Sequence, residues 1–203
     1  MQAGQINDEV RRLREKHPAI PVHAVVSDLC ASGGYYVAVA AEAIHVDKAS
    51  LIGSIGVRID AFGFQQAIEE LGIERRLLTA GANKGILDPF SPMPETQKVF
   101  LQSQLDQLHQ QFIAVVKAGR GDKLKGGEEL FSGLFWNGQD SLELGLADQF
   151  GSTESVARDV IGAEKIVEFT AKKDLFERLA NRMGTAMVNS FLELAGGAYP
   201  MAR

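Results

Sequence analysis

The sequence SDLCASGGYYVAVAA, residues 27–41, decides the fold of this chain. It follows a short apolar run, Val22–Val26, that is typical of a buried strand, and from Tyr35 onward it has the composition of a helix. The two glycines after Ser32 allow the tight turn that joins a strand to a helix. A serine at such a turn presents its hydroxyl to a cleft, as nucleophilic serines do. A glycine-rich turn without chemistry is the alternative interpretation.

Composition limits the classes of function. The chain has 203 residues, of which 45% are apolar and 23% charged, as in an ordinary globular domain. A formal net charge of −5 argues against a nucleic-acid partner. The single cysteine, Cys30, excludes an internal disulfide and is expected to pack in the core. The N-terminus does not resemble a signal peptide, and no apolar run approaches the ~20 residues of a membrane helix.

Short apolar strands alternate with amphipathic helices along the chain. This order predicts an α/β fold with a mainly parallel sheet and flanking helices. The helix 5–16 is expected to bury Ile6, Val10 and Leu13, and the helix after Pro94, ending near 117, to bury Leu101, Leu105, Leu108, Phe112 and Val115. The other predicted helices are 35–43, 64–71, 140–144 and 156–161, and the predicted strands are 22–27, 44–46, 73–79 and 166–169.

The domain organisation is predicted from the two ends of the chain. An α/β unit that opens on a helix is unusual, so we expect residues 1–170 to form a core that lacks its first strand. Residues 171–203 are expected to form an amphipathic helical extension. Its apolar stripe recurs at four-residue steps and is expected to pack on the domain or on another subunit: Leu175, Leu179, Met183, Met187 and Phe191.

A nucleophilic Ser32 requires a base. His17 and His109 are expected on polar helix faces, and His23 and His45 in strands. None has a local signature, although a Ser-His-Asp triad is recognised by geometry and stays open at this point. Lysine is the other known partner of a serine, provided that burial lowers its pKa toward neutrality. Lys84 lies among small, uncharged residues, AGANKG, although an exposed loop lysine is the simpler interpretation.

Four motifs in order carry a family resemblance: ASGGYY, LIGSIGV, AGANKGILDPF and FWNGQDSLELGLADQFG. Together they resemble the signal peptide peptidase A type of Ser/Lys protease (SppA and SohB), which has the ClpP/crotonase fold. The resemblance extends from about residue 4 to about residue 160. It implies that Ser32 is the nucleophile, Lys84 the general base and Ser54 the residue that orients the lysine amine. It also implies that the Gly33 N–H forms part of the oxyanion hole.

The resemblance has two main departures. The S-P-G-G loop, which supplies the second oxyanion donor in the family, is absent, and so is the family's membrane anchor. The loss of one oxyanion donor costs ~3 kcal/mol of transition-state stabilisation, so we expect low activity from this chain alone. The alternative interpretation of Ser54 is a turn residue without chemistry, because it lies between the glycines of the GSIG segment.

The resemblance implies a serine peptidase that cleaves hydrophobic or membrane-derived peptides, such as remnant signal peptides, and needs no cofactor or metal. It also implies a ring-like homo-oligomer that is membrane-associated in a bacterium through a segment outside this chain. Two alternatives stay open. One is a crotonase-like enzyme acting on acyl-CoA thioesters, which the absence of a basic cluster for the CoA phosphates disfavours. The other is an inactive scaffold that binds peptides.

Overall fold

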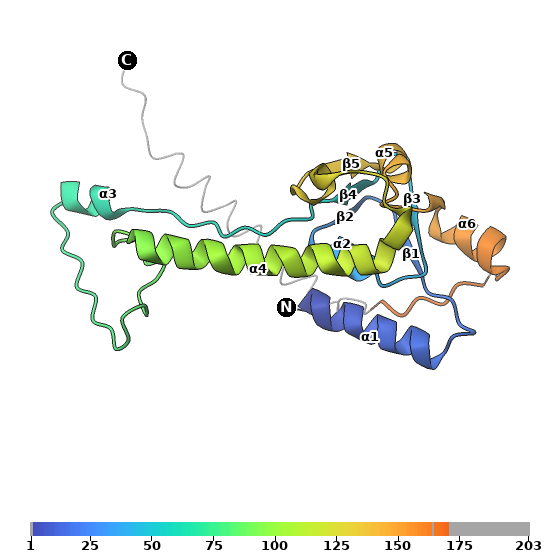
Figure 1. Cartoon of the computed structure of the whole chain (residues 1–203), viewed down its shortest axis with the longest axis horizontal. Coiled ribbons are helices and arrows are strands. Elements are labelled where there is room, and N and C mark those ends of the chain that lie inside the picture. Colours follow the sequence, from blue (N-terminus) through green and yellow to red (C-terminus); the bar gives the residue numbers. More distant parts are fainter. Residues whose placement is uncertain (1, 164, 171–203) are drawn as a thin grey trace, which may run out of the picture. The chain divides into compact units, whose positions relative to one another are not determined.

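Two three-stranded sheets form the centre of the fold (Figure 1). The computed structural model describes residues 2–163 and 165–170 of the chain. The strands are β1 (His23–Val26), β2 (Leu29–Ala31), β3 (Ala43–Val46), β4 (Leu51–Gly53), β5 (Phe135–Asn137) and β6 (Gln149–Phe150). The helices are α1 (Gln2–Lys16), α2 (Gly33–Ala38), α3 (Gln65–Glu70), α4 (Glu95–Arg120), α5 (Gly138–Glu143) and α6 (Thr153–Ser155). Two 3₁₀ turns, Gly121–Lys123 and Glu128–Phe131, and a π-helix, Val156–Ile161, complete the described elements.

The strand pairing is mainly parallel, which confirms the predicted α/β class. The first sheet has the order β1-β3-β6, with every pair parallel. In the second sheet, of order β2-β4-β5, β2 and β4 are parallel and β5 is antiparallel to β4. The hydroxyl of Ser50, a buried residue, lies 2.9 Å from the carbonyl oxygen of Val26 and ties the two sheets where the chain passes from one to the other.

The core lies between these sheets, α2 and the C-terminal half of α4. Its largest fully buried apolar side chains are Tyr35, Ile44, Ile52, Ile55, Leu130, Leu146, Val39, Val46 and Val116. Cys30 packs against this cluster, as expected, and burial raises its pKa to about 11, so it remains a neutral thiol at pH 7. Its role is therefore packing.

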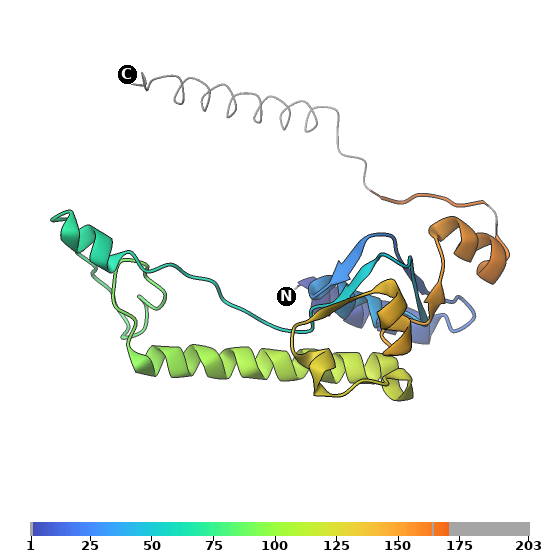
Figure 2. The ribbon, with the colours of Figure 1, turned by 90° about the horizontal axis from the view of Figure 1, so that it is seen from above.

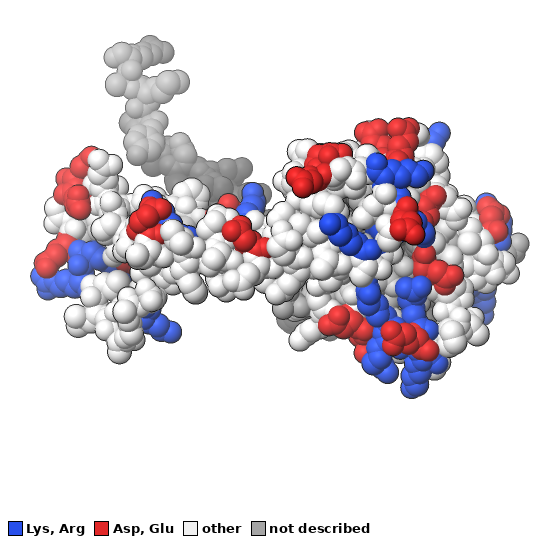
Figure 3. Space-filling view, viewed as in Figure 1, with Lys and Arg blue, Asp and Glu red and all other residues white. Residues whose placement is uncertain are grey.

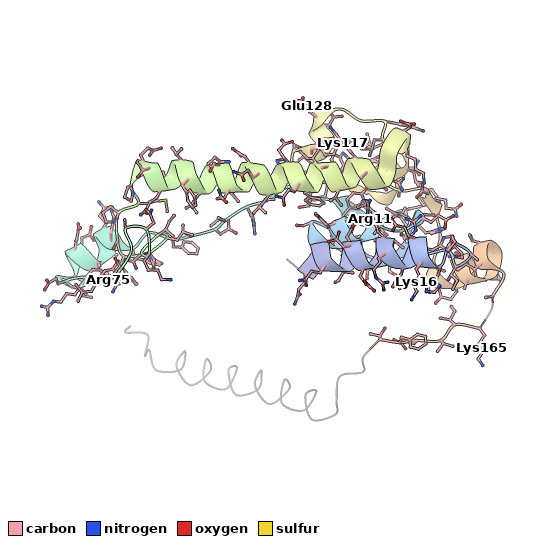
Figure 4. All side chains as sticks on the ribbon, turned by 60° about the horizontal axis from the view of Figure 1, so that its bottom comes forward. Arg11, Lys16, Arg75, Lys117, Glu128 and Lys165 are labelled. Carbon is pink, nitrogen blue, oxygen red and sulfur yellow. The ribbon has the colours of Figure 1, made fainter. Side chains whose placement is uncertain are left out.

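Helix α1 is amphipathic, but its buried face differs from the predicted one. Ile6 and Leu13 remain 49% and 39% exposed. The buried residue is Asn7, which donates a hydrogen bond from Nδ2 to the carbonyl oxygen of Tyr36 at 2.6 Å. A polar side chain on the buried face of a helix is invisible to an apolar periodicity. Figure 4 shows Arg11 on the same helix, and its guanidinium lies 3.5 Å from the carbonyl oxygen of Val115 in α4.

Helix α4 extends well beyond the core (Figures 1 and 2). Phe112 and Val116 are buried, whereas Leu108, a predicted core residue, is 39% exposed. At 1.5 Å per residue, α4 is about 39 Å long, and only its C-terminal half meets the two sheets. The predicted burial of Leu108 is therefore wrong: the buried face of α4 is centred between Phe112 and Val116, and Leu108 lies at the edge of that face.

The segment of residues 57–94, which we call the arm, leaves the second sheet and returns at the start of α4 (Figure 2). The strand predicted at 73–79 is wrong: these residues form no strand in the structure. Ile73, Leu77 and Leu78 are 55%, 41% and 96% exposed. A strand needs a partner for its N–H and C=O groups, and within the described chain no other strand lies beside this segment.

The chain divides into two units, residues 1–164 and 165–203. Of the second unit the structure describes residues 165–170, and the strand predicted at 166–169 is wrong, since no strand is formed there. Phe169 is 92% exposed. The predicted amphipathic extension at 171–203 lies outside the described residues, so that domain division stays a prediction. Among the helices that the structure describes, none combines the length and the apolarity needed to cross a membrane.

Candidate active site

Ser32 lies where β2 ends and α2 begins. Its backbone has φ 52° and ψ −120°, a conformation that is unfavourable for any residue with a side chain. Its N–H donates a hydrogen bond to the carbonyl oxygen of Gly53 at 2.8 Å. The neighbouring strand thus holds the turn in place, and Ser32 itself is exposed. An exposed serine in a strained strand-to-helix turn is the local geometry predicted for a nucleophile.

Ser54 lies beside Ser32. The parallel register pairs Ala31 of β2 with Gly53 of β4, so Ser32 and Ser54 leave adjacent strands at the same edge of the sheet. Ser54 also has a positive φ, 52°, and its N–H donates to the carbonyl oxygen of Leu134 at 2.7 Å. Two neighbouring non-glycine residues with positive φ indicate a functional site, because such backbone strain persists only where the surrounding structure enforces it.

Gly33 is the first residue of α2, so its N–H has no acceptor within the helix. The same first turn of α2 is anchored by Tyr35, which is fully buried and donates a hydrogen bond from its hydroxyl to the carbonyl oxygen of Leu146 at 2.8 Å. Burial raises the pKa of Tyr35, so the hydroxyl keeps its proton and remains a donor. The Gly33 N–H therefore has a fixed orientation next to Ser32.

Lys84 lies in the arm, apart from the two serines. The Oδ1 atom of its neighbour Asn83 lies 3.5 Å from the Nε2 atom of Gln97, which is in the first turn of α4. His109, further along α4, contacts Ile55 beside Ser54. The helical rise places about 18 Å between Gln97 and His109 along the axis. Within one chain the structure thus brings Ser32, Gly33 and Ser54 together and leaves Lys84 outside hydrogen-bond distance.

The arm has its own small cluster. In Figure 4, Arg75 lies near the N-terminal end of α4, whereas Lys117 lies toward the other end of that helix. Arg75 pairs with Asp88 at 3.2 Å, and its guanidinium lies over the ring of Phe90 at 5.9 Å. The Phe64 ring is 5.9 Å from that of Phe90. These contacts hold the two sides of the arm to each other, near Lys84 and away from the core.

None of the four histidines hydrogen-bonds to Ser32 in the described residues. His23 and His45 pair with each other, 2.9 Å between Nδ1 and Nε2, on β1 and β3. His17 follows the end of α1. The prediction that His109 lies on a polar helix face is wrong: its Nε2 atom lies 3.1 Å from the carbonyl oxygen of Ile55. Its spacing of three and seven residues from Phe112 and Val116 is the sequence signal that indicates its inward orientation.

The charges of the molecule form no dominant patch on the face seen in Figure 3, where Lys and Arg alternate with Asp and Glu. The surface along α4 is largely uncharged in this view. Within residues 2–163 and 165–170, no group of three or more His, Cys, Asp or Glu side chains is placed to hold a metal ion.

Comparison with known proteins supports the resemblance. The profile of Peptidase family S49 matches residues 14–167, about three quarters of the chain. The chain is 40% identical over 162 residues to a Brucella abortus protein named Na(+)/H(+) antiporter NhaA, covering 80% of this chain and 22% of that protein. It is 30% identical over 164 residues to the putative protease MJ0651 of Methanocaldococcus jannaschii, covering 78% and 53%.

A third relative carries the family's name. The chain is 26% identical over 169 residues to the putative signal peptide peptidase SppA of Enterococcus faecium, covering 83% of this chain and 48% of that protein. The chain thus spans between about a fifth and a half of the length of these relatives. The matched region contains Ser32, Ser54 and Lys84 and extends past the FWNGQDSLELGLADQFG motif. The chain belongs to peptidase family S49, the SppA-type peptidases of the ClpP/crotonase superfamily.

Proposed function

We propose that this chain is a serine peptidase with a Ser32–Lys84 dyad. The Ser32 hydroxyl attacks the carbonyl carbon of a peptide bond while neutral Lys84 accepts its proton. Lys84 then passes the proton to the leaving amine, and water hydrolyses the acyl-enzyme with the same base. The observation that carries the proposal is the strained, exposed Ser32 next to Ser54 at the end of two parallel strands.

Two further residues have supporting roles in this proposal. The Gly33 N–H stabilises the negative oxygen of the tetrahedral intermediate, and Ser54 orients the lysine amine. The position of Ser54 on the strand adjacent to Ser32 supports its role, since an amine between the two hydroxyls can bond to both. The histidine contacts support lysine over histidine as the base, because the Nε2 of His109 donates to a carbonyl oxygen and His45 is fully buried.

Lys84 is proposed to reach Ser32 of a second copy of the chain. Within one chain about 18 Å of helix separates the Lys84 region from the Ser54 turn. The arm that carries Lys84 exposes apolar side chains that a second copy would bury: Phe62 at 76%, Leu71 at 73% and Leu78 at 96% exposure. A homo-oligomer would satisfy both observations.

The proposed substrates are hydrophobic or membrane-derived peptides, such as remnant signal peptides. Leu29 and Leu51 support this proposal, because they are cross-strand neighbours on β2 and β4 and are 67% and 38% exposed. They provide apolar surface on the sheet that ends at Ser32. Membrane association through a segment outside this chain is part of the same proposal.

The first test uses a fluorophosphonate probe, which labels activated serines. We expect labelling of Ser32 in the wild type, none in Ser32→Ala and a loss of at least about a hundredfold in labelling rate in Lys84→Arg, because arginine keeps the charge but cannot accept a proton. Absence of labelling in the wild type would favour the peptide-binding scaffold. Thioester hydrolysis that survives Lys84→Arg would favour the acyl-CoA enzyme.

The second test addresses the source of Lys84. Ser32→Ala and Lys84→Ala chains are co-expressed and assayed on one apolar peptide. If the dyad forms between copies, random mixing restores up to about a quarter of the wild-type sites, because each site needs one chain of each kind. A mixture with no activity, from variants that assemble normally, would place both residues of each dyad in the same chain.

A further inference from the structure

We propose that His109 is a positioning residue for this active site: its imidazole holds the backbone of the Ser54 turn from helix α4. This inference rests on the proposed function, since it assigns a role to a residue behind the proposed dyad.

The direction of the His109 contact follows from its chemistry. The Nε2 atom of His109 lies 3.1 Å from the carbonyl oxygen of Ile55. A carbonyl oxygen only accepts hydrogen bonds, so Nε2 carries the proton and donates it. The proton donor role is kept whether or not Nδ1 is also protonated, because Nε2–H is present in both forms.

The carbonyl that His109 binds belongs to the residue after Ser54. Ser54 has φ 52°, a conformation that costs about 1–2 kcal/mol for a residue with a Cβ atom and needs support from its surroundings. On one side, the Ser54 N–H is held by the carbonyl oxygen of Leu134 at 2.7 Å. On the other side, the buried Ile55 is held by His109. The turn is therefore fixed at both ends, once by backbone and once by this imidazole.

The helix that supplies His109 gives the contact a second consequence. Phe112 and Val116, three and seven residues further along α4, anchor the same face of the helix in the core. The other end of α4 lies beside the arm, where Asn83 meets Gln97 next to Lys84. His109 is thus the polar member of the inward face of α4. Through it, the helix whose other end contacts the arm next to Lys84 also contacts the Ser54 turn.

A purely packing role would be filled better by an apolar residue. Leucine or phenylalanine at this position would complete the apolar face but would leave the Ile55 carbonyl oxygen without this donor. Glutamine keeps an N–H donor at a similar distance from the helix backbone. The pair His109→Ala and His109→Gln therefore separates loss of the hydrogen bond from loss of the ring.

The test compares three variants in the assembled protein: His109→Ala, His109→Gln and, as the matched control, Gln110→Ala, an exposed position on the same helix. We expect His109→Ala to lower kcat by about three- to tenfold, the effect of one lost hydrogen bond, with KM changed less than about twofold. His109→Gln is expected to recover most of kcat, and Gln110→Ala to match the wild type.

Hydrogen–deuterium exchange of the peptide spanning 53–57 supplies a readout that needs no activity. We expect faster exchange there in His109→Ala and near-normal exchange in His109→Gln. Wild-type kcat and exchange in His109→Ala would overturn the positioning role, and so would a loss that glutamine fails to reduce. If Ser32→Ala cleaves peptides like the wild type, the proposed function itself fails, whatever His109→Ala does.

Discussion

The amide of Ser32 donates to the carbonyl oxygen of Gly53 at 2.8 Å, so the turn before α2 is held by the strand that leads to Ser54. This position requires glycine for two reasons. Its φ of +113° is a conformation for glycine, and a Cβ atom there would lie 2.9 Å from the carbonyl oxygen of Leu134 and from the ring of Trp136. Both serines of the site therefore depend on this glycine.

Gly53→Ala is expected to reduce kcat by at least about tenfold and to lower the free energy of unfolding by about 1–3 kcal/mol, because the backbone strain and the clash act together. Gly4→Ala is the control: its Cβ would lie 4.0 Å from the nearest atom, the Tyr36 hydroxyl, and alanine favours the helix. Urea denaturation and steady-state kinetics measure both effects. Equal stability of the two variants would contradict the prediction.

Arg120 and Asp148 form a second essential contact. The buried guanidinium of Arg120 donates to both carboxylate oxygens, at 2.7 and 3.1 Å, and Lys123 donates to the same carboxylate at 2.7 Å. We expect Asp148→Asn to lower the free energy of unfolding by about 3 kcal/mol, because it leaves Arg120 buried without its counter-charge. Lys123→Ala, which removes the half-exposed partner, should cost less than about 1 kcal/mol. Comparable losses in chemical denaturation would contradict this difference.

Asp148 also sets an acid limit on stability. Burial acts to raise its pKa, but the hydrogen bonds from Arg120, Lys123 and the Ile44 N–H outweigh burial and lower the pKa to about 2. The unfolded chain binds this proton near pH 4, so the stabilisation is complete above that pH and is lost as the pH falls from about 4 through 2. Between pH 4 and pH 2, the free energy of unfolding, measured by chemical denaturation, should therefore decrease less in Asp148→Asn than in the wild type.

His45 gives a separate pH dependence nearer neutrality. Burial, and then the adjacent His23, lower the pKa of His45, while the charge of Asp148 opposes them. The unfolded chain therefore takes up a proton near pH 6.5 that the folded protein resists. The free energy of unfolding should be highest above pH 6.5 and decrease below it, by at most about 1.4 kcal/mol per pH unit, until the folded pKa is reached.

The measurement for His45 is urea denaturation at pH 7.5 and 5.5 at one protein concentration. The difference in the free energy of unfolding between the two pH values should be smaller in His45→Gln than in the wild type. His17→Gln, a substitution at an exposed position, should leave that difference unchanged. An unchanged difference in His45→Gln would assign the pH dependence to another group.

The packing of α4 on α2 depends on Gly119. A Cβ atom at this position would collide with the carbonyl oxygen of Val39 and lie 2.9 Å from its Cβ. Helix propensity alone predicts that Gly119→Ala stabilises the protein by up to about 1 kcal/mol. We expect the opposite sign, a loss of about 1–3 kcal/mol, because the obstructing atoms belong to the backbone. Gln104→Ala, exposed on the same helix, should change little, and a stabilised Gly119→Ala would refute the close packing.

The sequence by itself determined the local features of this protein. The run before Ser32, the glycines after it and the GSIG segment predicted a strand, a turn and a second turn, because those conformations depend on neighbouring residues alone. The four ordered motifs also predicted the family, which the profile match confirms. The assignment of Lys84 as the base remains a prediction of the resemblance.

Only the tertiary structure decided what depends on contacts between distant segments. The apolar run at 73–79 reads as a strand but has no partner in the described chain. Leu108 fits a helical stripe but lies at the edge of the buried face of α4. Conversely, Asn7 and His109 are polar, so no apolar pattern could place them against Tyr36 and Ile55. Burial is a property of where two elements meet, and a residue's polarity predicts it only when no specific hydrogen bond compensates for desolvation.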